Sequence, residues 1–311
     1  MSFVASIVSI IAPALVQCQM AIAVIVYLEG TYHHPSLPLR DAAYVAAAHI
    51  ATQAKLDSSS KTTAFCNLCY ALDHHELLAG QRESVLLAIS IMASAGLESE
   101  TFAMSSQTLR RILTLPSKTT CERASAIQAA IALIQTSSKN VTAANEFTQI
   151  FISLLSGNRR SDNYDVMYPV LRSFVIQMPG GETTLRHLIS GLTTATTASD
   201  AAVRHGAALG MLAIFEGCER DKGGSGVRRV LQIQPETFAD VVSGCLDDDI
   251  GIRAIYIRCL KCVAIALEMT LVLKDLEKFE HTKNLEKKKK RREKKSGIMG
   301  IGEVEEEVEE E

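Results

Sequence analysis

The sequence repeats one pattern along most of its 311 residues: a turn, a basic residue and an apolar run of helical length. The clearest copies are residues 200–213 and 249–264, in which an acidic turn precedes the basic residue and small apolar residues follow it. A shorter amphipathic segment stands before each copy, at residues 184–192 and 235–246. A helix pair of this kind cannot bury its apolar face alone, so the pattern predicts units that stack on one another.

The period of this repeat separates it from several other repeat classes. Its basic position is occupied by Arg40, Arg82, Arg123, Arg204 and Arg253. Successive spacings are 42, 41, 81 and 49 residues, and the gap of 81 holds one degenerate unit at residues 164–178, with Met167 at the arginine position. The mean period lies in the range of about 40–47 residues typical of HEAT and armadillo arrays. Six units are therefore expected.

The acidic turn followed by Val-Arg and a small-residue helix, from Asp200 to Ala208, resembles the HEAT-repeat signature. The resemblance implies an all-α fold, a right-handed α-solenoid of about six HEAT-like helix pairs that fills residues 1–274. It also implies that the acidic and arginine positions bond between neighbouring units and have a structural role. The residues to which this ladder role is assigned are Asp200, Arg204, Asp249, Arg253, Arg40, Arg82 and Arg123.

The composition agrees with helices that pack through small side chains. Aromatic residues make up 5% of the chain and Trp is absent, whereas strands are usually richer in aromatic residues. Most of the eight cysteines lie in apolar helical runs, as expected of buried thiols in a reducing compartment. We therefore expect an intracellular protein of the cytoplasm, the nucleus or both. The formal net charge of −3 gives the chain as a whole no general affinity for nucleic acid.

Two cysteine pairs have the residue types of a metal site. Cys66 and Cys69 are followed by His74-His75, and paired thiolates and imidazoles are common zinc ligands. A spacing of three, however, places both thiols on one face of a single helix. Cys259 and Cys262 have the same spacing. Both pairs are interpreted as buried thiols, and no metal site is expected.

Other short motifs also predict no chemistry. His75-Glu76 resembles the iron-binding His-Glu pairs of HEAT-repeat hydroxylases, but that family repeats the pair several times and this sequence has it once. Residues 223–226 are glycine-rich without a following Lys-Ser/Thr, so we expect a flexible inter-helix loop. Arg228 and Arg229 are expected near a turn, either solvated or in a basic rim. No catalytic residue and no cofactor is expected.

The N-terminal segment, residues 3–28, contains no charged residue and is long enough to cross a bilayer. Pro13, Gln17 and Gln19 interrupt its apolar character, and no basic region precedes it. The segment is interpreted as the first repeat helix. Because a terminal unit exposes a face that the next unit would otherwise cover, we expect a partner or self-association to cover it, with a membrane as the alternative.

The C-terminal part changes composition sharply. Residues 275–295 are expected to form a basic extension of the last helix, and residues 296–311 a flexible acidic tail. The candidate basic contacts to a partner or to phosphate are Lys287, Lys288, Lys289, Lys290, Arg291, Arg292, Lys294 and Lys295. Such a run is typical of a nuclear localisation signal or of an arm that binds nucleic acid.

Together these features predict a non-catalytic scaffold or adaptor that binds one or more proteins as a subunit of a larger complex. Two alternatives stay open. The first is a nuclear protein that associates with nucleic acid through the basic run, and the second is a membrane-associated adaptor that uses residues 3–28.

Overall fold

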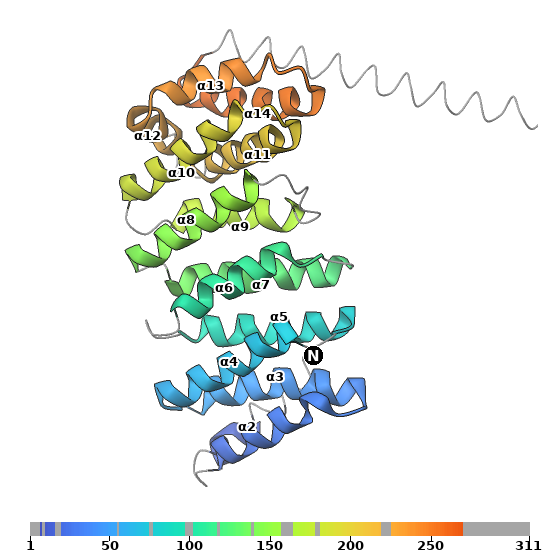
Figure 1. The fold of residues 1–311 in the computed structure, drawn as a ribbon. Coiled ribbons are helices and arrows are strands. Elements are labelled where there is room, and N and C mark those ends of the chain that lie inside the picture. The colour runs from blue at the N-terminus through green and yellow to red at the C-terminus, as the bar shows by residue number, and fades with distance from the viewer. Residues whose placement is uncertain are drawn as a thin grey trace, which may run out of the picture.

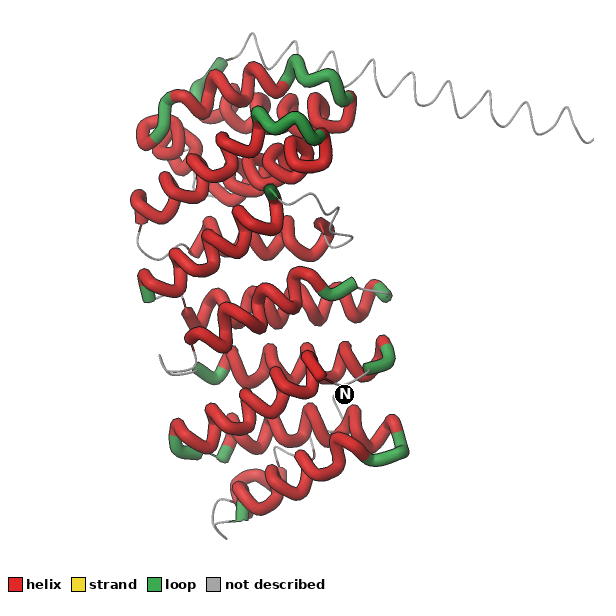
Figure 2. Tube along the Cα trace, viewed as in Figure 1, coloured by secondary structure: helices red, strands yellow, loops and turns green. Residues whose placement is uncertain are grey.

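The computed structural model describes residues 7, 10–15, 20–54, 56–74, 77–96, 102–116, 119–137, 140–156, 164–177, 181–218 and 225–269. The predicted basic extension and acidic tail, with all eight candidate basic contacts, lie outside these ranges, as does the His75-Glu76 pair. Within the described ranges every regular element is a helix and no strand is present (Figure 2).

The helices alternate between two layers, which we call A and B. The A helices are α2 (Ala21–Gly30), α4 (Ser58–His74), α6 (Phe102–Thr114), α8 (Val141–Leu155), α10 (Gly181–Thr196) and α13 (Glu236–Gly244). The B helices are α3 (Leu37–Gln53), α5 (Ala79–Ser94), α7 (Thr120–Ser137), α9 (Tyr164–Gln177), α11 (Ala201–Cys218) and α14 (Ile250–Ala266). The short 3-10 helix η1 (Thr31–His33) and α12 (Ser225–Ile233) stand outside this alternation. Units one to six are the successive A and B pairs.

The pairs are stacked one on another from the N-terminal end to the C-terminal end (Figure 1). The B helices contact one another in the order α3, α5, α7, α9, α11 and α14, and the A helices follow in parallel order beside them. Because each unit packs mainly on the units before and after it, the molecule is a solenoid. The predicted all-α solenoid of six helix pairs is confirmed within the described residues.

The repeat position read from the sequence has one structural meaning. It is the fourth residue of every B helix, occupied by Arg40, Arg82, Arg123, Met167, Arg204 and Arg253. The degenerate unit therefore keeps the register of the others, with Met167 in place of the arginine.

Small residues let the B helices lie close to their neighbours. Helix α11 is buried on several sides, and many of its buried residues are Ala or Gly. A Cβ atom on Gly206 would lie 2.3 Å from the backbone oxygen of Leu155 in α8. The two backbones therefore approach more closely than any larger residue would permit.

The expected loop at residues 223–226 is wrong in its second half, and residues 223 and 224 lie outside the described residues. The chain begins a helix, α12, at Ser225, so Arg228 and Arg229 lie near the start of a helix. Val227 and Val230 are fully buried, which gives this short helix an apolar side that packs on α11 and α14. The extra helix explains why the last two repeat arginines are 49 residues apart and not about 41.

Candidate functional site

Charged links join successive units at the starts of the B helices. Nε of Arg82 lies 3.0 Å from Oε1 of Glu122, which begins the next unit's B helix. Nη1 of Arg123 lies 2.8 Å from Oδ2 of Asp165, and Nε of Arg204 lies 2.8 Å from Oδ2 of Asp247. Each link therefore connects one unit to the next.

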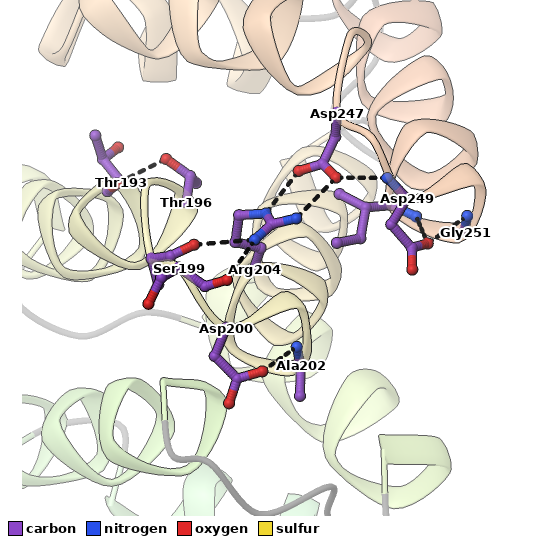
Figure 3. A network of polar contacts seen from close by, with 11 residues as sticks. Thr193, Thr196, Ser199, Asp200, Ala202, Arg204, Asp247, Asp249 and Gly251 are labelled. Atoms are coloured by element: carbon purple, nitrogen blue, oxygen red, sulfur yellow. Dashed lines mark hydrogen bonds and ion pairs between the residues drawn. The ribbon is translucent and has the colours of Figure 1, made fainter.

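Arg204 has the most complete set of partners (Figure 3). Its Nε and Nη2 donate to the two carboxylate oxygens of Asp247, at 2.8 and 3.2 Å. Its Nη1 donates to the carbonyls of Ala198 and Ser199, at 3.1 and 3.0 Å. A bidentate pair of this kind fixes orientation as well as distance. Arg204 thus ties the turn before its own helix to the turn before α14.

The predicted acidic residues lie at helix starts and not across the unit junction. Oδ1 of Asp200 accepts from the backbone N–H of Ala202 at 2.8 Å. Oδ1 of Asp249 accepts from Gly251 and Ile252 at 2.7 and 3.1 Å, which caps α14. The carboxylate that meets Arg204 is Asp247, which sequence reasoning missed because three consecutive aspartates precede α14.

The first and last arginines of the predicted ladder make no ion pair with another unit among the described residues. Arg40 donates from Nε to the carbonyl of His34 within its own unit. Arg253 makes no ion pair with any residue in the described part of the chain. It begins the last B helix, where no further unit follows within that part.

The Arg204 link predicts a pH dependence of stability. Hydrogen bonds from Arg204 hold the pKa of Asp247 below its usual range. A lowered pKa stabilises the fold fully above the ordinary aspartate value of about 3.9, and this stability is lost as the pH falls below it. We expect Asp247→Asn to lower the free energy of unfolding by about 2 kcal/mol between pH 5 and 8, from the lost charged hydrogen bonds. The difference in the free energy of unfolding between the variant and the wild type should become smaller below about pH 4.

Urea unfolding at several pH values measures this difference. Asp249→Asn, two residues further on, is the control because asparagine caps a helix about as well as aspartate. A difference for Asp247→Asn that is constant down to pH 2, or equal to that of Asp249→Asn, would contradict the prediction.

A second network, which sequence reasoning also missed, lies near the C-terminal end of α11. Glu216 accepts from Arg258 of α14 at 2.6 Å and lies 3.7 Å from Arg172 of α9. The hydroxyl of Tyr168, also on α9, donates to the same carboxylate. Burial, followed by the hydrogen bond to Glu216, raises the pKa of Tyr168, so the phenol stays neutral. One carboxylate thus links three successive B helices.

The helix pairs are stacked, one repeat position recurs on every B helix, and links join successive units. These features decide to which structural class of protein the chain belongs. The chain is a helical-repeat protein. It is similar to the solved structures of two engineered proteins, with 16% identity over 77% of this chain and 98% of the other (TM-score 0.40), and 13% identity over 88% and 66% (TM-score 0.42). It is also similar to a designed armadillo repeat protein, with 12% identity over 76% and 98% (TM-score 0.36). No family model and no curated protein matches the sequence.

The large apolar side chains that the repeat protein exposes are concentrated at its two ends. Of nineteen such residues in the described ranges, nine lie in the first 39 residues and six lie between Phe238 and Leu267. The four intervening units expose only the remaining four. Within the described residues, interior units have a neighbouring unit on both sides, whereas the first and last units have one on a single side.

The face at the N-terminal end is hollowed into an apolar groove of about 560 Å³. Its lining side chains include Leu39, Ala42, Ala43, Ala46 and Ile50 of α3, together with Val24, Tyr27 and Leu28 of α2 and Ile7, Ile11 and Leu15 from the segment before it. Tyr27 and Leu39 are 72% and 53% exposed, so the groove is open to solvent. None of the described helices combines the length and the apolar character needed to span a membrane.

Three of the four paired cysteines, Cys69, Cys259 and Cys262, are buried in this repeat protein, and Cys66 is partly exposed. Cys69 lies in the core, where its sulfur accepts from the hydroxyl of Thr108 at 3.2 Å, and burial raises the pKa of its thiol to about 12. Cys259 is fully buried, which raises its thiol pKa well above the usual value. Such thiols are neutral near pH 7, whereas zinc binds thiolates. Within the described ranges, no three His, Cys, Asp or Glu side chains converge as a metal would require.

Proposed function

We propose that the solenoid is a protein-binding scaffold and that the groove of unit one receives an amphipathic helix from a partner protein. The single observation that carries this proposal is the open apolar groove lined by α2, α3 and the segment before α2. A soluble chain gains free energy when such a surface is covered, at about 25 cal/mol for each Å² of apolar area removed from water.

The pattern of the groove walls supports a helix as the occupant. On α3 the lining residues, Leu39, Ala42, Ala43, Ala46 and Ile50, follow the spacing of one helix face. The small alanines permit close approach of another helix. On α2 the lining residues also recur at three- and four-residue spacing. A partner helix would therefore pack into the groove through its own apolar stripe, as in other helix-in-groove complexes.

The finer features of this proposal rest on less direct support. Membership of a larger complex follows from a scaffold role. An intracellular location is supported by seven free cysteines in the described residues. Nuclear import and nucleic-acid contact through Lys287 to Lys295 stay predictions, because that run lies outside the described residues.

The test replaces exposed groove residues with a carboxylate. Tyr27→Glu and Leu39→Glu should each weaken binding of a captured partner, and of a synthetic helix from that partner, by more than tenfold, because the groove would bury an unpaired charge. Both side chains are more than half exposed, so the fold should persist. Leu246→Glu is the matched control, since Leu246 is 78% exposed at the other end.

Three measurements decide among the occupants of the groove. Calorimetry with the synthetic helix tests the proposal directly. Wild-type dimers that Tyr27→Glu dissociates in analytical ultracentrifugation would replace the partner helix by a second copy of this chain. Flotation of the wild type with liposomes, lost in Leu39→Glu, would replace it by a membrane surface.

A further inference from the structure

A polar pocket of about 360 Å³ lies between units five and six. Thr196 and Thr197 line it from the end of α10, and Asp240 and Ser243 from α13. The turn before α14 adds further carboxylates, and Tyr256 of α14 forms part of the wall. The pocket is separate from the apolar groove, which is formed by the first unit.

Tyr256 brings a buried hydroxyl without a partner to this pocket. Its side chain is only 2% exposed, and its hydroxyl makes no hydrogen bond among the described residues. A Cβ atom on Gly244 would lie 2.2 Å from the Tyr256 ring, so the glycine is needed for the ring to lie where it does. Tyr256 lines the pocket together with Asp240 and Asp247. Burial raises the pKa of Tyr256, and the charges of Cys259, Asp240 and Asp247 raise it further. A buried hydroxyl left unpaired in this way calls for a ligand or a water.

The charges around the pocket do not balance. Asp240, Asp247 and Asp248 contribute three carboxylates, whereas Arg204 is the one cation that lines it. Arg204 is already bound to Asp247 and to two backbone carbonyls. Asp240 accepts only from the hydroxyl of Thr193, at 3.2 Å, and burial raises the pKa of its carboxyl. Asp240 and Asp248 therefore form no ion pair among the described residues.

We propose that this pocket binds the cationic head of a lysine or arginine side chain from a basic segment of a partner protein. The ammonium or guanidinium group would donate to Asp240 and to the hydroxyls of Tyr256 and Ser243, while Asp248 supplies charge at the rim. Lysine and arginine are donors only, and the unsatisfied groups that line the pocket are acceptors or hydroxyls that act as acceptors. The proposal rests on the scaffold function but uses a different site.

The probe is a fluorescent peptide with the sequence of residues 287–295 of this chain, KKKKRREKK. The control peptide has glutamine at every basic position. Fluorescence anisotropy with the full-length chain should give binding to the basic peptide that is at least about tenfold tighter, and raising the ionic strength from about 0.05 to 0.3 M should weaken it. A variant of the chain with glutamine at every basic position of residues 287–295 distinguishes the chain's own tail from a partner protein as the source of the cation. If this variant binds the peptide more tightly than the wild type does, the chain's own tail occupies the pocket.

Two variants and one matched control locate the site. Asp240→Asn should weaken the basic peptide about tenfold, and Tyr256→Phe about fivefold, because each removes one acceptor of a charged hydrogen bond. Neither substitution should lower the melting temperature. Burial disfavours the ionised form of the Asp240 carboxyl, and the Tyr256 hydroxyl is unpaired among the described residues. Asp165→Asn removes the same charge from an exposed site in α9 and should change binding by less than about twofold.

Equal affinity of the two peptides for the wild type, or equal loss in all three variants, would overturn the proposal. Displacement of the basic peptide by about 1 mM calcium chloride at constant ionic strength would overturn it in favour of a metal site. The groove variant Tyr27→Glu should keep the wild-type affinity for the peptide. A failure here therefore leaves the groove proposal intact, and a failure of the groove leaves this one intact.

Discussion

Replacing Glu122 by glutamine is expected to lower the free energy of unfolding by about 3–5 kcal/mol. The Glu122 side chain is only 2% exposed, and its partner Arg82 is 11% exposed, so neither charge has much access to water. Loss of the carboxylate leaves the guanidinium buried beside a neutral amide, with a weak contact from Nη1 to the carbonyl of Pro116 at 3.4 Å. Urea unfolding followed by circular dichroism measures the change.

The Arg123–Asp165 link provides a control at the next junction. Its arginine has the same position in the repeat and its distance is short at 2.8 Å, but its two side chains are 40% and 67% exposed. Asp165→Asn should therefore cost less than about 1 kcal/mol. The double variant Arg82→Met with Glu122→Leu should recover most of the loss, because it removes both buried charges. Equal losses for Glu122→Gln and Asp165→Asn would show that burial does not set the strength of these links.

We also expect Gly206→Ala to destabilise the fold by about 2–3 kcal/mol, through overpacking at the contact between α11 and α8. The added Cβ would meet a backbone oxygen of Leu155 at 2.3 Å, together with the hydroxyl of Tyr164 at 3.0 Å. A backbone atom cannot rotate away as a flexible side chain can. The helices must therefore separate, and the shift would reach every residue packed between them.

Gly80→Ala is the matched control for Gly206→Ala. Gly80 also lies in a B helix, α5, but no atom lies within 4 Å of a Cβ built on it. The same substitution should there be neutral or stabilise by up to about 1 kcal/mol, because alanine favours helix. Thermal unfolding of the two variants in parallel tests the pair. A stable Gly206→Ala variant would mean that α8 and α11 do not approach as closely as described.

The repeat register was predictable from the sequence because it depends on local features. A basic residue in the first turn and a run of small apolar residues mark most of the B helices, and all six repeat positions, Met167 of α9 included, proved to be the fourth residue of their helices. Local periodicity also placed the A helices of units five and six, although α10 extends beyond the amphipathic stretch on both sides. Helix α12 was missed because glycines at its start outweighed the apolar spacing of Val227 and Val230.

The residues that join the units were less predictable, because they depend on the path of the turns. Three aspartates precede α14, and only the structure shows that the first of them faces Arg204 while the third caps the helix. Glu216 gave no signal in the sequence, since its partners come from α9 and α14, more than forty residues away on either side. The unpaired hydroxyl of Tyr256 and the groove in unit one are likewise products of tertiary packing.

The positions of the charged links imply that the solenoid does not have uniform stiffness along its axis. Between units five and six the B helices are joined twice, by Arg204 to Asp247 near one end of α11 and by Glu216 to Arg258 near the other. Two separated attachments resist both tilting and twisting, so α11 and α14 should move together as one rigid block. Between units three and four, the ion pair that the described residues form between the B helices is exposed and lies at one end of them. A pull on the two ends of the molecule would therefore bend it more easily between units three and four than between units five and six.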